Sequence, residues 1–87
     1  MNYLPIMYTT IDDYGRSHTV LVKELGSSLE LDTVENIDEA IREEFETSTK
    51  VENENGKEYR ISDCHTVLNG KHIGFWQNAD STWRLDY

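Results

Sequence analysis

The sequence predicts an α+β fold in which one amphipathic helix packs on one face of an antiparallel sheet of about five strands, in the order ββ-α-βββ. Three observations support this prediction. Runs rich in β-branched and aromatic residues occupy both ends of the chain, a middle segment has helical periodicity, and Gly-containing turn sequences separate the runs. With 87 residues, the chain is expected to form a single domain over residues 1–87.

The first predicted unit is a hairpin. Residues 6–11 and 19–25 are rich in β-branched and aromatic residues. Between them, the sequence Asp12-Asp13-Tyr14-Gly15 favours a turn. Residues 29–31 alternate in polarity, so they either extend the sheet or lead into the helix.

The middle of the chain contains the predicted helix, over residues 36–48. Asn36 is a suitable N-cap, and Glu39 three residues later completes a capping box. Apolar residues then recur at helical spacing, with most charged residues on the opposite side. Glu44 and Ser48 fall inside the apolar arc. Either Glu44 therefore extends past the edge of the core, or this end of the helix is only partly covered.

The C-terminal half is predicted to be a meander of antiparallel strands. Asn55-Gly56 and Asn69-Gly70 are both typical of type I′ hairpin turns. The strands that these turns imply cover residues 50–53, 58–63, 66–68 and 71–77, and a last strand covers residues 82–86.

Trp76 and Trp83 belong either to the core or to an exposed recognition surface. Aromatic residues of this kind are enriched in interface hot spots. Core packing is nevertheless favoured, because so small a protein needs its largest side chains to close the sheet against the helix.

The net charge of −9 is concentrated in the middle third of the chain. Residues 1–29 carry a net charge of −1, and residues 59–87 carry none. Between Glu30 and Glu58, eleven acidic residues stand against three basic ones, which gives a net charge of −8. The basic residues are scattered singly and the overall field repels phosphate, so no direct binding of DNA or RNA is expected.

Cys64 is the only cysteine, which excludes an intrachain disulfide framework and fits a reducing compartment. No stretch is apolar enough to span a bilayer, and the first residues do not resemble a secretory signal. The expected location is cytoplasmic, in the host cell if the protein is phage-encoded, with no membrane partner.

Asp63, Cys64, His65 and His72 are the residues that could carry metal or nucleophile chemistry. Structural zinc sites usually show paired Cys or His at short fixed spacing, which this sequence lacks. Cys64 and His65 are adjacent on a predicted strand and so point to opposite faces. No Gly-rich phosphate loop, nucleophile elbow or HExxH helix is present. We therefore expect no enzyme activity, no catalytic residue, no metal and no cofactor.

The acidic residues of the predicted helix are placed unfavourably for helix stability. Glu35/Glu39 and Glu39/Glu43 are like-charge pairs at i, i+4, each costing about 0.2–0.5 kcal/mol. Acidic residues near the helix C-terminus also oppose the macrodipole. Solubility alone does not require such local frustration, so we interpret this side as a binding surface. The predicted contact residues are Glu35, Asp38, Glu39, Glu43 and Glu46, with Glu52 and Glu54 from the following hairpin.

The density of this charge is close to that of a nucleic acid. A helix of about 13 residues is about 20 Å long, and duplex DNA of that length carries on the order of 12 phosphates, about half of which face one protein. In size, charge and absence of disulfides, the chain resembles small acidic phage or mobile-element inhibitors of restriction, CRISPR or transcription machinery. The leading hypothesis is a non-enzymatic inhibitor that acts as a DNA mimic, of the anti-CRISPR or anti-restriction type, and occludes the basic nucleic-acid-binding surface of a partner protein.

Two alternatives accompany this hypothesis. The first is an immunity or antitoxin protein, whose acidic face meets a basic toxin while apolar residues supply affinity. The second is a small enzyme or metalloprotein that uses Cys64, His65 and His72. Under any of these hypotheses the chain is expected to be a monomer or a homodimer, because the final strand, left as a sheet edge, could pair with its twin.

Overall fold

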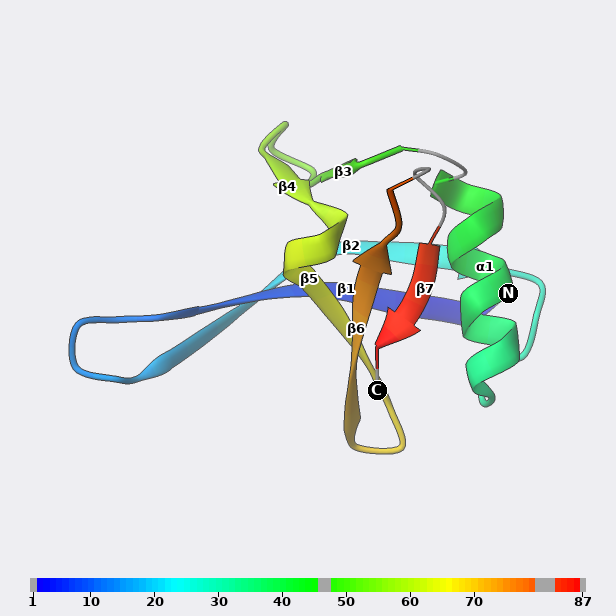
Figure 1. Cartoon of the computed structure of the whole chain (residues 1–87), viewed down its shortest axis with the longest axis horizontal. Coiled ribbons are helices and arrows are strands. Elements are labelled where there is room, and N and C mark those ends of the chain that lie inside the picture. Colours follow the sequence, from blue (N-terminus) through cyan, green and yellow to red (C-terminus); the bar gives the residue numbers. More distant parts are fainter. Residues whose placement is uncertain (1, 46–47, 80–82, 87) are drawn as a thin grey trace.

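The structure, a computed structural model, describes residues 2–45, 48–79 and 83–86 and confirms the predicted α+β class. Its elements are β1 (Asn2–Ile11), β2 (Ser17–Ser27), α1 (Val34–Phe45), β3 (Lys50–Glu52), β4 (Glu58–Arg60), the 3₁₀ helix η1 (Ile61–Asp63), β5 (Cys64–Leu68), β6 (Lys71–Gln77) and β7 (Trp83–Asp86), shown in Figure 1.

Two separate sheets account for these strands. The main sheet has the order β2-β1-β5-β6-β7, and every neighbouring pair is antiparallel. Its strands follow the predicted order ββ-α-βββ. The β3-β4 hairpin, in contrast, forms a second sheet of its own, which the sequence did not predict.

The β1-β2 hairpin is longer than predicted, and its tip projects from the body of the molecule (Figure 1). At the tip, the backbone N–H of Gly15 donates to the carbonyl of Asp12 over 3.0 Å. One carboxylate oxygen of Asp12 accepts the backbone N–H groups of Tyr14 and Arg16, each over 2.9 Å. Gly15 takes the φ of +78° that this turn requires. The predicted turn is therefore confirmed.

A β-bulge interrupts this hairpin near its middle. Ile6 pairs with Lys23 and Met7 pairs with Leu21, so Val22 is an extra residue on β2. Because of this insertion, Val22 turns toward the core and is 5% exposed.

The predicted N-cap and capping box of the helix are wrong. α1 begins at Val34, and the hydroxyl of Thr33 accepts the backbone N–H of Asn36 over 3.2 Å, which makes Thr33 the N-cap. The side chain of Asn36 instead donates to the carbonyl of Glu30 over 2.7 Å. The described helix extends to Phe45, and Ser48 is not helical. Residues 29–31 lead into the helix and form no strand.

The turn between β3 and β4 is not of the predicted type I′. The N–H of Gly56 donates to the carbonyl of Asn53 over 3.1 Å, and the N–H of Asn53 donates to the carbonyl of Lys57 over 2.9 Å. Gly56 has a positive φ of +84°, whereas Asn55 does not take the left-handed conformation that a type I′ turn needs. This arrangement repeats that of the first hairpin, with Asn53 in the place of Asp12.

The second Asn-Gly sequence behaves as predicted. Asn69 has a φ of +52° and Gly70 a φ of +80°, as a type I′ turn between β5 and β6 requires. The strand predicted over residues 58–63, however, ends at Arg60, and η1 occupies residues 61–63.

One hydrophobic core lies between the main sheet, α1 and the β3-β4 hairpin. Ile37, Ile41 and Phe45 of the helix pack in one cluster with Leu4 and Ile6 of β1. The core holds α1 by its apolar side, so the acidic side faces outward. The other buried members of the cluster are Val22, Leu25, Val51, Ile61, Cys64, Ile73 and Phe75.

The preference for a core position is wrong for Trp76, which is 50% exposed. Its neighbour Phe75 takes the inward position on β6 and is 3% exposed, so Trp76 points to the outer face of the sheet. There it stands opposite Arg84 on β7, whose guanidinium carbon lies 5.4 Å from the ring centroid. The side chain of Trp83 lies outside the described residues.

Candidate functional site

The helix presents three predicted contact residues in a row on its outer side. Glu35, Glu39 and Glu43 are exposed and follow one another at i, i+4, so neighbouring side chains start about 5–6 Å apart. No ion pair within the described part of the chain engages any of these three carboxylates. Their mutual repulsion is therefore left uncompensated along the length of the helix.

Asp38 stands beside this row but is partly neutralised. Its carboxylate oxygen Oδ2 lies 2.8 Å from Nε of Arg42, one turn further along the helix. The exposed fraction of the Asp38 side chain is 32%. Asp38 therefore contributes less to the outward field than the three glutamates do.

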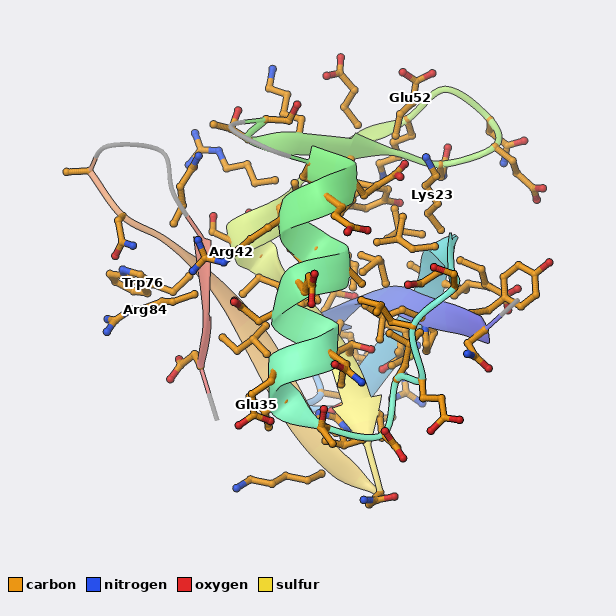
Figure 2. The ribbon with its side chains drawn as sticks, turned by 90° about the vertical axis from the view of Figure 1, so that its right-hand side faces the viewer. Lys23, Glu35, Arg42, Glu52, Trp76 and Arg84 are labelled. Carbon is orange, nitrogen blue, oxygen red and sulfur yellow. The ribbon has the colours of Figure 1, made fainter. Side chains whose placement is uncertain are left out.

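The acidic surface continues past the C-terminal end of the helix. Figure 2 shows Glu35 near one end of α1 and Glu52 beyond the other end, on β3. Glu52 and Glu54 are both exposed. The predicted contact residue Glu46 lies outside the described residues. The acidic ridge, as we call this surface, comprises Glu35, Asp38, Glu39, Glu43, Glu52 and Glu54.

A groove of about 540 Å³ lies beside the ridge, between β2 and the β3-β4 loop. Residues 21–24 line one side and residues 52–55 the other. The groove brings Glu24 to the same hollow as Glu52 and Glu54. Sequence reasoning missed Glu24, because only tertiary packing brings β2 to this hairpin.

Lys23 connects the groove to the helix. Its Nζ lies 3.6 Å from Oε1 of Glu44, and both side chains are nearly half exposed. Phe45 is buried at this end of the helix, so the structure favours the first alternative for Glu44: its side chain extends past the edge of the core. There its ion pair with Lys23 joins α1 to β2.

The β3-β4 hairpin also carries like charges side by side. Lys50 is paired in register with Arg60, and Glu52 with Glu58. Like charges directly opposite each other destabilise a strand pair. The contact of 3.9 Å between Nζ of Lys50 and Oε2 of Glu58 compensates only part of this repulsion. The hairpin, like the helix, thus keeps acidic groups at a cost to its own stability.

Cys64, His65 and His72 do not converge on one site. Cys64 is buried on the inner side of the sheet, where its thiol donates to the carbonyl of Arg60 over 3.3 Å. His65 lies on the outer side and stacks on His72, with ring centroids 4.8 Å apart. Among the described residues, no group of three or more His, Cys, Asp or Glu side chains is placed to hold a metal ion.

The ionisation of these residues follows their burial. Burial, and secondarily the nearby charge of Asp63, raises the pKa of the Cys64 thiol to about 11, so the thiol stays protonated at neutral pH. Burial is also the main cause that lowers the pKa of His65, and repulsion from His72 adds to it. A protonated thiol is a poor nucleophile and a poor metal ligand.

Comparisons with protein-family models, with curated proteins and with solved structures find no match to this chain. Within the described residues, no helix combines the length and apolar character needed to cross a membrane.

Proposed function

We propose that this protein is a non-enzymatic inhibitor whose acidic ridge occupies the basic nucleic-acid-binding surface of a partner protein. It acts as a mimic of nucleic acid, of the anti-restriction or anti-CRISPR type, in the cytoplasm of a host cell. The row of Glu35, Glu39 and Glu43, exposed and without a basic partner in the described structure, is the observation that carries the proposal.

The glutamate row destabilises the helix that carries it. Each i, i+4 pair of glutamates destabilises α1 slightly, and Glu43 lies in its C-terminal half, where the macrodipole disfavours an acid. Arg42 is nearby, and its Nε contacts the carboxylate of Asp38. A basic partner surface would relieve this repulsion on binding, because each carboxylate would then find a cation.

The number of available charges fits the mimicry. The 12 residues of α1 span about 18 Å. Duplex DNA of that length presents on the order of five phosphates to one protein face. Glu35, Glu39, Glu43, Glu52 and Glu54 supply five carboxylates that no ion pair engages within the described residues.

The first test is affinity capture from host lysate at low salt, with and without an excess of competing duplex DNA and RNA. Mass spectrometry identifies the captured proteins. We expect a nucleic-acid-binding protein that the competing nucleic acid displaces. Capture of a partner that is indifferent to the competitor would contradict mimicry and favour the immunity or antitoxin alternative.

The second test measures binding of that partner by two variants with the same net charge. Glu39→Lys/Glu43→Lys reverses two ridge charges, whereas Asp13→Lys/Asp63→Lys reverses two exposed charges on other elements. Loss of electrostatic steering should slow association of the ridge variant by about 10–100-fold at low salt. The control should lose far less. Equal losses in both variants would mean that net charge alone, without a defined ridge, accounts for binding.

A further inference from the structure

β1 is uncharged along its whole length, although 29% of the residues in the chain are charged. Alternate residues of β1 point inward, where Leu4 and Ile6 are buried in the core. The other set, including Tyr3, Met7 and Ile11, points to the outer face of the sheet. A sheet face that meets water normally carries polar residues. Packing of the core therefore explains why the inward residues of β1 are apolar, but it does not explain why the outward residues carry no charge.

The outward set continues onto β2. Met7 is paired in register with Leu21, and Thr9 with Thr19, whose hydroxyls lie 2.7 Å apart. Tyr3 is 61% exposed, Leu21 54% and Ile11 72%. The neutral strip, as we call this surface, comprises Tyr3, Pro5, Met7, Thr9 and Ile11 of β1 with Thr19 and Leu21 of β2.

We propose that the neutral strip is the interface of a symmetric dimer of this chain. Its occupant must be neutral and apolar, because the strip offers no charge for a basic or acidic partner to read. Glu24, in register with Pro5, borders the strip on β2. A second copy supplies a strip of the same chemistry, and two strips related by a twofold axis bury each other.

Two copies with a net charge of −9 each repel, and this face keeps the glutamate row of α1 out of the contact. α1 packs against the core on the inner side of the sheet with the row facing away from it, and the strip lies on the outer side. Glu24, Glu52 and Glu54 are closer to the contact, because they line one groove with Leu21 at the edge of β2. Repulsion between these carboxylates weakens the dimer at low salt and is screened as the salt concentration rises.

The size of the strip sets the strength of the dimer. From Tyr3 to Ile11, β1 spans about 27 Å, and two strands with their side chains are about 14 Å wide. This outline includes β2 residues outside the strip, so the strip offers at most about 400 Å² per copy, half of the ~800 Å² per partner in a standard interface. An interface of this size belongs to the weak, transient class, and we expect a dissociation constant in the micromolar range.

Analytical ultracentrifugation from about 5 to about 200 µM protein, a range that brackets this dissociation constant, tests the proposal. The natural chain should pass from monomer to dimer. Leu21→Glu should weaken dimerisation at least about 100-fold, because a symmetric interface carries the added charge twice. The matched control is Val20→Glu. Val20 is 47% exposed, and it points to the opposite face from its neighbour Leu21, so dimerisation should be unchanged.

Salt dependence supplies a second measurement. Raising the salt concentration screens the repulsion between two acidic chains, so the dimer should strengthen, whereas binding through the acidic ridge should weaken. Glu39→Lys/Glu43→Lys should dimerise at least as well as the natural chain, which separates this proposal from the proposed function. A monomer throughout the concentration range would overturn the dimer. So would equal effects of Leu21→Glu and Val20→Glu in chains that circular dichroism shows to be folded.

Discussion

The acidic ridge and the neutral strip are carried by different elements of one small fold and differ in almost every physical respect. The ridge keeps carboxylates close together at a cost to the elements that carry them. The strip keeps large apolar side chains in water without a charge among them. The net charge of −9 therefore describes neither surface. The ridge carries more charge than the fold requires, and the strip carries less.

The largest expected effect is the difference in the free energy of unfolding between a substitution in the core beneath the helix and a substitution in the exposed strip. Ile41 is 1% exposed at the centre of the helix face, so Ile41→Ala should lower the free energy of unfolding by about 2–5 kcal/mol. Leu21→Ala removes a side chain that is 54% exposed, and should change it by less than about 0.5 kcal/mol in the monomer. Urea denaturation at low protein concentration measures both. Similar losses would show that the strip takes part in the folding core.

The next effect concerns the buried thiol of Cys64 and an exposed position two residues before it, in η1. With its pKa raised to about 11, Cys64 has about 200-fold less thiolate at pH 8 than an ordinary thiol. The native protein should therefore react very slowly with Ellman's reagent, and quickly once unfolded. The control is Cys64→Ala/Ser62→Cys, which places the thiol at an exposed position nearby. Equal rates for the two native proteins would contradict the burial of Cys64.

A smaller effect tests whether the ridge sacrifices stability for binding. Glu39→Lys converts two repulsive i, i+4 pairs into attractive ones, with Glu35 and Glu43, and should stabilise the protein by about 0.8–2 kcal/mol. The same change should weaken binding to the partner. Thermal denaturation and binding of one preparation give both quantities. A variant that is both less stable and fully active would show that the glutamate row serves the fold.

The smallest effect concerns His65, next to the neutral strip. Its pKa is lowered in the folded protein, so the unfolded chain binds the proton more readily, and stability falls as the pH drops from about 6.5 through the folded-state pKa. His65→Gln should remove this contribution. Melting temperatures of both proteins between about pH 7.5 and pH 5 measure it. Parallel curves would indicate that His65 ionises alike in both states.

Local rules predicted most of the elements, and their failures have a common cause. The Asn69-Gly70 turn has the type I′ geometry that its dipeptide favours, because the strands on either side continue directly into it. Asn55-Gly56 has the same dipeptide, yet the carboxamide of Asn53 accepts the backbone N–H groups of Asn55 and Lys57 and fixes a different turn. Thr33 likewise outcompetes Asn36 as the cap. In both cases, a side chain a few residues upstream accepts a backbone N–H group and so determines the local structure.

The candidate surfaces were predictable only where they are local in sequence. The helix row is visible in the spacing of Glu35, Glu39 and Glu43, since one element carries all three. The pairing of Lys23 with Glu44 and the position of Glu24 at the groove depend on how β2 packs against other elements, which no local pattern encodes. The neutral strip, in contrast, was visible in the sequence. Tyr3, Pro5 and Met7 alternate with core residues, as outward-facing residues of a strand do, but they are not the polar residues expected at such positions.

The bulge at Val22 also bears on how this protein avoids uncontrolled assembly. β2 is the edge of the main sheet and is 11 residues long, which would otherwise give a continuous template for another strand. The extra residue breaks the regular spacing of the free backbone groups halfway along, and Lys23 and Glu24 follow it directly. Sheet growth from this edge is thereby interrupted. Association through the neutral strip uses the outer face of the sheet instead. A twofold contact there joins only two copies and cannot grow into a filament.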